Sequence, residues 1–183
     1  MSNGKLTPTS YLVLGSITLL GEATSYDLKG LVGLSIGHFW TFPHSQLYAE
    51  PARLAQMGLL SEDRERGGRR RRVYSITEEG RRELQEWLAE PETPPTELRD
   101  MGALKLFFGH LVSREDVVRL AKAQLASKKE RLAEYEAIEA RFFEGITGLD
   151  FQLAVLRCGI AVERAVMEFW TNIAENPPTR SAT

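Results

Sequence analysis

Apolar residues in the first part of the chain recur at helical spacing in three successive runs. Over residues 7–20 the run places four side chains on one face: Tyr11, Leu14, Ile17 and Leu20. Thr24 followed by Asp27 is typical of a capped helix N-terminus, so a second helix is predicted to follow it. A third helix is predicted over residues 41–57, where Gly58 ends it.

After Gly58 the pattern changes from helical spacing to the alternation of a strand. Leu59 and Leu60 precede a charged run, and beyond it polar and apolar side chains alternate through Arg72, Tyr74 and Ile76. The Gly67-Gly68 pair between them can take the positive φ angles of a tight turn, which predicts a two-stranded ribbon. Thr77 then caps a fourth helix. Three helices, a hairpin and a fourth helix predict a winged helix-turn-helix over residues 1–90.

A proline-rich segment at residues 91–96 predicts the domain boundary, because proline lacks an amide proton and fixes φ. Beyond it we expect a helix over 98–111, a longer helix opened by Ser113, and a last helix over 151–174. The longer helix has eight positions at coiled-coil spacing, of which only Lys128 and Glu139 are polar or charged exceptions: 118, 121, 125, 128, 132, 135, 139 and 142.

The pattern as a whole predicts a mostly α fold. A winged helix-turn-helix is followed by a helical dimerisation and effector domain over residues 97–175, with a tail at 176–183. The last helix is apolar over a wide arc, which one neighbour within the chain would not cover. We therefore expect a homodimer, with four residues chosen for its contacts: Tyr11, Ile160, Met167 and Trp170.

Composition limits the classes of partner and compartment. The formal net charge is −2 and the pI is near 6.0, so any DNA contact has to come from a local patch. The single Cys158 excludes an internal disulfide and a cysteine-rich zinc site, and no histidine spacing suggests a metal. The longest apolar stretch, 11–20, is too short for a membrane span, so we expect a cytoplasmic protein with no membrane partner.

Arginines are concentrated at the tip of the predicted hairpin, with only Glu65 opposing them. They are Arg64, Arg66, Arg69, Arg70, Arg71 and Arg72. Such a one-sign ribbon can grip phosphates or enter a narrow minor groove, although a charged run is also typical of a solvated loop. The third helix opens with short polar side chains that can read a major groove, namely His44, Ser45 and Gln46, followed by Tyr48. The sequence thus predicts a double-stranded DNA operator as the partner.

The chain resembles the PadR-type transcriptional regulators, particularly the longer members with a helical C-terminal domain. The resemblance rests on short motifs spread over nearly the whole length: Tyr11-Leu12-Val13-Leu14-Gly15, Ser25-Tyr26-Asp27-Leu28, Phe39-Trp40, His44-Ser45-Gln46-Leu47-Tyr48, Gly58-Leu59-Leu60, Tyr74-Ser75-Ile76-Thr77-Glu78-Glu79-Gly80, and Asp100 with Leu104-Lys105 and Phe108. It implies a homodimer with recognition helices in successive major grooves, flanking wings, and DNA affinity lowered by a small ligand. Ser25 and Tyr26 are counted among the expected DNA contacts.

The resemblance also allows a phenolic-acid-type effector, whose carboxylate would need a cation in an otherwise apolar pocket. The candidates are Lys105, Arg157 and Arg164, together with Trp40, although a surface ion pair is the simpler expectation for each cation. No cofactor is expected. The resulting hypothesis is a ligand-responsive repressor on a pseudo-palindromic operator, with half-sites roughly 34 Å apart.

Three features of the sequence compete with this interpretation or depart from it. Pro51 lies inside the third helix, where the family pattern prefers leucine, so we expect a kink or early break there. Residues 33–37 match the G-x-S-x-G elbow around Ser35, but a helix precedes them where a hydrolase needs a strand, so no enzyme is expected. The remaining alternative is a helical protein-interaction module without DNA binding, which leaves the arginine cluster unexplained.

Overall fold

The structure is a computed structural model that describes residues 5–40, 43, 45–64, 71–143 and 148–178. The chain divides into two compact units, Met1–Pro94 and Pro95–Thr183, and each is considered by itself. Helices dominate both units, and among the described residues the strands lie in the first. The predicted fold class, mostly α with an N-terminal winged helix, is confirmed.

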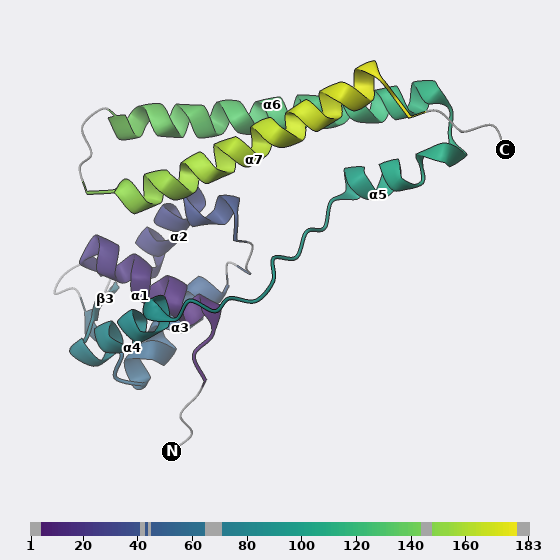
Figure 1. The fold of residues 1–183 in the computed structure, drawn as a ribbon. Coiled ribbons are helices and arrows are strands. Elements are labelled where there is room, and N and C mark those ends of the chain that lie inside the picture. The colour runs from purple at the N-terminus through teal and green to yellow at the C-terminus, as the bar shows by residue number, and fades with distance from the viewer. Residues whose placement is uncertain (1–4, 41–42, 44, 65–70, 144–147, 179–183) are drawn as a thin grey trace. The chain divides into compact units, whose positions relative to one another are not determined.

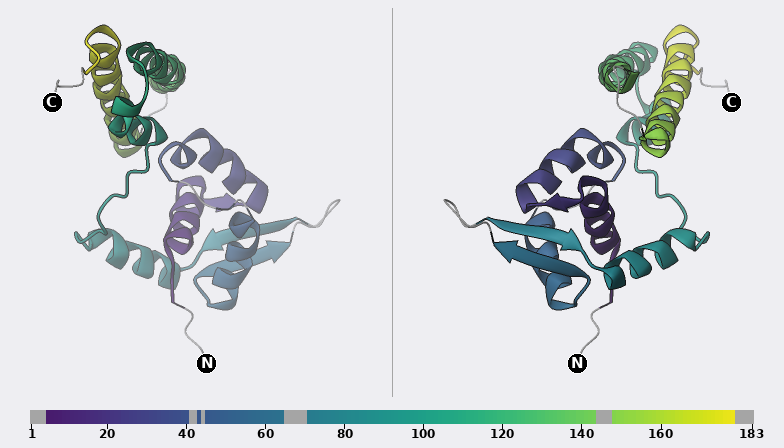
Figure 2. Two further views of the ribbon diagram at one scale, coloured as in Figure 1. Left: turned by 90° about the vertical axis from the view of Figure 1, so that its right-hand side faces the viewer. Right: turned by 90° about the vertical axis from the view of Figure 1, so that its left-hand side faces the viewer.

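The first unit packs four helices around a small sheet (Figures 1 and 2). Its elements are α1 (Pro8–Leu20), β1 (Glu22–Ala23), α2 (Ser25–Leu34), a 3-10 turn (Ile36–His38), α3 (Gln46–Gln56), β2 (Leu60–Arg64), β3 (Arg72–Ile76) and α4 (Glu78–Ala89). The strand order is β1-β3-β2, and both pairings are antiparallel. The register sets Ser61 opposite Ser75 and Glu62 opposite Tyr74.

Side-chain caps fix where these helices begin. The Thr24 hydroxyl accepts from the Asp27 amide while the Asp27 carboxylate accepts from the Thr24 amide, which is a complete capping box. Thr7 and Ser10 form a second capping box at α1, and Thr77 accepts from the Gly80 amide at α4. The predicted caps at Thr24 and Thr77 are therefore confirmed.

The structure corrects the expected sheet and third helix. The wing is part of a three-stranded sheet, because Glu22 and Ala23 form a short strand that pairs with β3. A strand of two residues is too short to give a pattern in the sequence. Helix α3 begins at Gln46, several residues later than expected. It continues without a break through Pro51, so the predicted early break is wrong. The proline ring is fully buried against the core, where packing offsets the missing hydrogen bond.

The core of the first unit is closed and apolar. Its fully buried side chains come from α1, α2 and α3, and the wing adds Tyr74: Val13, Leu14, Ile17, Leu28, Val32, Leu47 and Leu54. Gly80 allows α4 to pack closely against Leu59, the residue before β2, since a Cβ at position 80 would lie 2.1 Å from the Leu59 carbonyl oxygen. The core thereby holds α3 and the wing in fixed positions relative to α2.

The second unit is an antiparallel helical hairpin with a short helix at its start (Figure 1). It comprises α5 (Met101–Phe107), a 3-10 turn (Gly109–Leu111), α6 (Arg114–Phe143) and α7 (Asp150–Glu175). The helix expected over 98–111 is in fact shorter and divided, because Asp100 caps it through the Ala103 amide and the chain tightens after Phe107. Its core cluster is small: Val117, Ala121, Trp170 and Ile173.

The two exceptions in the coiled-coil pattern of α6 both have ion-pair partners on α7. The Lys128 Nζ lies 3.2 Å from a Glu163 carboxylate oxygen, and Glu163 is buried. The Arg157 Nε donates to Glu139 at 2.7 Å. Charges at these two positions are thus compatible with the hairpin because the facing helix supplies the opposite charge.

The connection between the two units, residues 90–100, contains neither helix nor strand, and nearly all of it is exposed. It includes the predicted linker at 91–96. Within the described ranges, no helix is long and apolar enough to cross a membrane.

Candidate nucleic-acid interface

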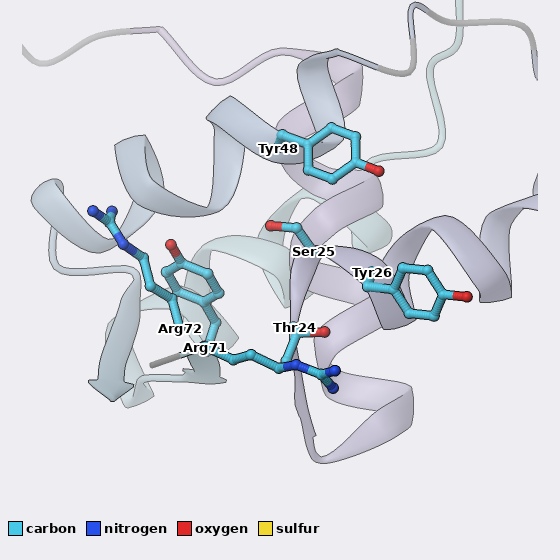
Figure 3. A pocket seen from close by; sticks show the side chains of 7 residues that line it. Thr24, Ser25, Tyr26, Tyr48, Arg71 and Arg72 are labelled. Atoms are coloured by element: carbon cyan, nitrogen blue, oxygen red, sulfur yellow. The ribbon is translucent and has the colours of Figure 1, made fainter. Parts of the chain in front are cut away.

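An open depression of about 440 Å³ lies between α2, α3 and the wing (Figure 3). Seven residues line it: Thr24, Ser25, Tyr26, Tyr48, Arg71, Arg72 and Tyr74. Five of these side chains carry a hydroxyl group and two carry a guanidinium group, so all seven have donors for phosphate oxygens or base-edge acceptors. The depression brings together Ser25, Tyr26, Tyr48, Arg71 and Arg72, which the sequence placed in separate elements.

Helix α2 supplies one wall of the depression. The capping box fixes where the helix begins, so Ser25 and Tyr26 are its first two residues. Tyr26 is 74% exposed. Hydrogen bonds from the Thr24 hydroxyl and amide hold the pKa of the Asp27 carboxyl below its usual value, with a smaller contribution from the Arg71 charge. Asp27 is thus an anion in the first turn of α2 that is stabilised mainly by Thr24 and slightly by the charge of Arg71 on the wing.

The wing supplies the opposite wall. Figure 3 shows the Arg71 side chain extending toward the start of α2, whereas Arg72 points away from it. A hydrogen bond with Tyr74, followed by the charge of Glu62 at 3.5 Å, raises the pKa of the Arg72 guanidinium. Both arginines are exposed, so their charge is available to a polyanion. The other predicted wing contacts, Arg66, Arg69 and Arg70, lie outside the described residues.

Helix α3 presents two different edges beside its buried face. Leu47, Pro51 and Leu54 are buried, and Tyr48 projects into the depression with 51% of its surface exposed. Ser45 is exposed and precedes the helix. Gln46 lies at the edge that meets α1, where its Oε1 accepts from the Thr9 hydroxyl at 2.9 Å. His44 falls outside the described residues.

A partly buried polar network continues along this α1 edge. The Ser10 Oγ donates to Glu50 Oε1 at 2.6 Å and accepts from Arg53 Nη2 at 2.9 Å. Arg53 also donates to both Glu50 oxygens, at 2.6 and 2.9 Å. Burial would raise the pKa of the Glu50 carboxyl, but the hydrogen bonds from Arg53 and Ser10 outweigh it, so the pKa lies below the ordinary value.

Sequence reasoning missed this network of Ser10, Glu50 and Arg53, and also Thr9. The spacing of Gln46, Glu50 and Arg53 at four and three residues was the available signal, because it places three polar groups on one edge of a helix. Nothing in the sequence indicated that α1 would supply their partners, since more than thirty-five residues separate Thr9 from Gln46.

Two of the four residues chosen for the dimer contact are buried in the interior of the second unit. Ile160 is buried and Trp170 is 1% exposed, so neither offers appreciable surface to another chain. Met167 is partly buried. Tyr11 of the first unit stacks on Trp87 at 4.4 Å between ring centroids, and burial raises the pKa of its hydroxyl.

The candidate effector residues do not form a common site within either unit. Arg157 contacts Glu139, and Arg164 Nη2 donates to Glu136 at 2.8 Å, so both form ion pairs between α6 and α7. Lys105 and Trp40 are exposed, and they belong to different units.

Ser35 ends α2 and donates its hydroxyl hydrogen to the Leu31 carbonyl at 2.6 Å. A helix precedes it, which differs from the strand that a hydrolase elbow requires. Among the residues that the structure describes, no cluster of histidine, cysteine, aspartate and glutamate side chains is arranged to hold a metal ion.

Two family models match the chain in the same order as its two units. The model of the transcriptional regulator PadR-like family matches residues 13–86, and that of the virulence activator alpha C-terminal domain matches residues 98–176. A probable transcriptional regulator of Mycobacterium tuberculosis is 30% identical over 179 residues, which cover 87% of this chain and 93% of that protein.

The negative transcriptional regulator PadR of Bacillus subtilis is 29% identical over 128 residues, 69% of this chain and 70% of that protein. Its crystal structure with operator DNA has a TM-score of 0.82 at 25% identity and covers 92% of this chain and 98% of that one. It has also been crystallised with p-coumaric acid.

The virulence activator AphA of Vibrio cholerae has a TM-score of 0.68 at 28% identity, over 90% of this chain and 96% of that one. The matches thus cover both halves of the sequence. One half forms the winged helix with its depression beside α3, and the other forms the helical second unit. The chain belongs to the PadR-like family of transcriptional regulators.

Proposed function

We propose that this DNA-binding regulator acts as a homodimeric, ligand-responsive repressor on a pseudo-palindromic operator. Helix α3 of each subunit enters a major groove, and the wing arginines bind the flanking backbone. The observation that carries the proposal is the depression between α2, α3 and β3, where Tyr26, Tyr48 and Arg71 are all exposed on one surface. The Bacillus subtilis relative has been crystallised in complex with operator DNA, which supports DNA as the partner of this fold.

The chemistry of the depression suits a sugar-phosphate backbone. Tyrosine hydroxyls donate to phosphate oxygens, and arginines release condensed counterions when they neutralise phosphates. The net charge of the chain is negative, so this attraction depends on the local pair Arg71 and Arg72 and the neighbouring arginines of the sequence. Phosphate contacts of this kind fix register, while α3 supplies base contacts.

Salt dependence of DNA binding tests the placement of the wing. Because a dimer carries two wings, Arg71→Ala should flatten the slope of log affinity against log salt by roughly 1.8 and weaken operator and random DNA about equally. Arg82→Ala is the matched control, because Arg82 is an exposed arginine on α4, outside the depression. Equal slopes for wild type, Arg71→Ala and Arg72→Ala would contradict the proposal.

An exposed apolar row on α7 supports the dimer and replaces the residues inferred from sequence. Six exposed positions alternate in steps of four and three along one face, and we call them the α7 seam: Phe151, Val155, Cys158, Val162, Ala165 and Phe169. This is the spacing at which helices pack along one another. The α7 seam is separate from the buried face of the helix that carries Ile160 and Trp170.

The α7 seam is symmetric about its own midpoint, which suits an antiparallel pair of α7 helices around a two-fold axis. Such a pair places Cys158 beside Val162 of the partner subunit. Under mild oxidation Val162→Cys should therefore give a cross-linked dimer, because Cys158 of the partner subunit is level with it. Thr171→Cys is the control, since Thr171 is exposed on α7 but outside the seam. Cross-linking of the wild type alone, through Cys158 pairs, would indicate a parallel arrangement.

Release from the operator by a small aromatic carboxylic acid completes the proposal. It rests on the p-coumaric acid complex of the Bacillus subtilis relative and on exposed Lys105, whose ammonium can pair with a carboxylate. Titrating p-coumaric acid into the operator complex should weaken binding in wild type and less so in Lys105→Met. A promoter reporter whose output falls with the regulator and recovers with the acid supports repression, and the opposite sign would indicate an activator.

A further inference from the structure

The guanidinium of Arg53 on α3 is held in place by three neighbouring residues. Its Nε donates to Glu50 Oε2 at 2.9 Å, and its Nη2 donates to Glu50 Oε1 at 2.6 Å and to the Ser10 Oγ at 2.9 Å. Its Nη1 lies 3.2 Å from the sulfur of Met57, which is a weak acceptor. Because Ser10 is fully buried in α1, these contacts fix both the place of the guanidinium and the orientation of its plane.

One donor of this guanidinium is left for a partner outside the chain. A guanidinium has five N–H groups, and the contacts of Arg53 use four of them. Among the residues that the structure describes, none provides an acceptor for the second Nη1 hydrogen. The side chain of Arg53 is 35% exposed, whereas that of Glu50 is only 13% exposed. The ion pair therefore presents mainly its cation to solvent.

Arg53 and the depression lie on opposite sides of the outward face of α3. The buried face of the helix includes Pro51. At 3.6 residues per turn, the exposed residues Ala49 and Gln56 lie on the face away from it. Tyr48, which lines the depression, flanks this outward face on one side, and Arg53 flanks it on the other. A helix that lies in a major groove has a phosphate backbone along each side, so both flanks can reach phosphates.

We infer that Arg53 is a further DNA-binding residue, whose Nη1 donates to a phosphate oxygen of the operator strand that runs along the α1 side of α3. This rests on the proposed placement of α3 in the major groove. Glu50 and Ser10 order the guanidinium before DNA arrives, so little side-chain freedom is lost when the phosphate binds. The depression binds the backbone on the other side, and α3 is thereby held between the two strands.

The test uses the full chain, an operator selected from random DNA, and ethylation interference, which identifies the phosphates that binding requires. Wild type should require phosphates on both sides of the groove. In Arg53→Met, which keeps an unbranched side chain without a donor, one phosphate per bound subunit should no longer matter. An uncharged methylphosphonate at that phosphate should weaken binding roughly tenfold in wild type and less than about twofold in Arg53→Met.

A second pair of variants separates recognition from folding, because Arg53→Met leaves the Glu50 carboxylate without its cation. Glu50→Gln removes that charge and keeps an acceptor for Arg53. The double variant Glu50→Gln/Arg53→Met should therefore lose the same phosphate contact relative to Glu50→Gln. Arg82→Ala, on the exposed surface of α4, should keep every phosphate contact of wild type.

Arg71→Ala in the same experiment distinguishes the two ways in which the inference can fail. If Arg71→Ala loses a phosphate contact while both Arg53 variants retain all of theirs, Arg53 only stabilises the fold and the inference is wrong. If neither Arg71→Ala nor the Arg53 variants lose a phosphate contact, the proposed placement of α3 and the wing has failed instead.

Discussion

The two units of this regulator bury their apolar residues to very different extents. The first encloses residues from α1, α2, α3, β2 and β3 in one core, and its functional surface is a polar depression. The second has a core cluster of four buried residues and leaves large side chains in solvent, including Phe107 and Phe151 at 78% and 86% exposure. Both units expose some large apolar side chains, such as Phe39 and Leu88 in the first, but the first encloses the larger core, whereas the second has apolar faces that suit association with another surface.

This contrast indicates a division of labour. The winged helix needs a rigid core because base contacts require α3 and the wing to keep fixed positions. If the proposed dimer forms, the helical unit uses much of its apolar surface for association, and its stability then depends on protein concentration. Substitutions in the two units should accordingly differ in kind as well as in size.

The largest effect is expected on the α7 seam. Val162→Glu places a charge at the middle of the proposed contact in each subunit, and it should weaken the dimer at least a hundredfold. Sedimentation across a range of concentrations measures this change. Thr171→Glu, which adds the same charge outside the seam, should leave the dimer intact. A fully dimeric and folded Val162→Glu would assign the seam to some other role.

Core truncations sharpen the comparison. Trp170→Ala removes a large ring that packs edge-on against Phe169, and it should destabilise the second unit by about 3–5 kcal/mol. Leu14→Ala should cost the first unit about 2–5 kcal/mol. Chemical unfolding followed by far-UV circular dichroism, to which the helices of both units contribute, and by DNA binding should show that each change lowers mainly its own transition. One shared transition in both variants would mean that the units unfold together.

Two glycine substitutions in the first unit should have opposite signs. Gly80→Ala brings a methyl group against the Leu59 carbonyl and should destabilise by about 1–3 kcal/mol, because backbone has to move. Gly30→Ala meets nothing within 4 Å in the middle of α2, so it should stabilise by about 0.5–1 kcal/mol. Thermal melts measure both. A Gly80→Ala melt equal to that of wild type would show that α4 can move away at little cost.

The smallest effect concerns the pH dependence of the α1–α3 network. The folded pKa of Glu50 lies below its ordinary value of 4.5, so its carboxylate stabilises the fold above that value. This contribution is lost as the pH falls from about 5 through the lowered pKa. Wild type should exceed Glu50→Gln in stability by about 1 kcal/mol or less at pH 7, and the difference should vanish in acid. If the stability difference between wild type and Glu50→Gln grew as the pH fell, the predicted direction of the pH dependence would be wrong.

Local signals in the sequence were sufficient for most of the fold. Thr24 and Thr77 cap helices through neighbouring residues, and the alternation around Tyr74 identified the wing, because caps and strands follow from near-neighbour chemistry. The two-residue β1 was missed because its pairing partner lies some fifty residues away. An early break at Pro51 was wrongly expected because the sequence does not show how much packing a buried proline ring gains.

The candidate site was only partly predictable for the same reason. Tyr26, Tyr48 and Arg71 were selected individually, but their convergence on one depression depends on tertiary packing. On α7 the apolar arc was recognised, yet the sequence did not show which part of it faces α6. Trp170 therefore appeared equally suited to an interface, although it is an interior residue.

The exposed connection around Pro94 has a consequence for engineering. Its residues form no helix or strand, so a junction cut there interrupts no regular backbone ladder. A chimera that joins residues 1–94 to the helical unit of a relative should exchange the proposed dimerisation module and keep the proposed operator-binding unit. Where the helical unit of that relative binds a small molecule, such a chimera should act as a sensor for it, with the splice point given by the fold.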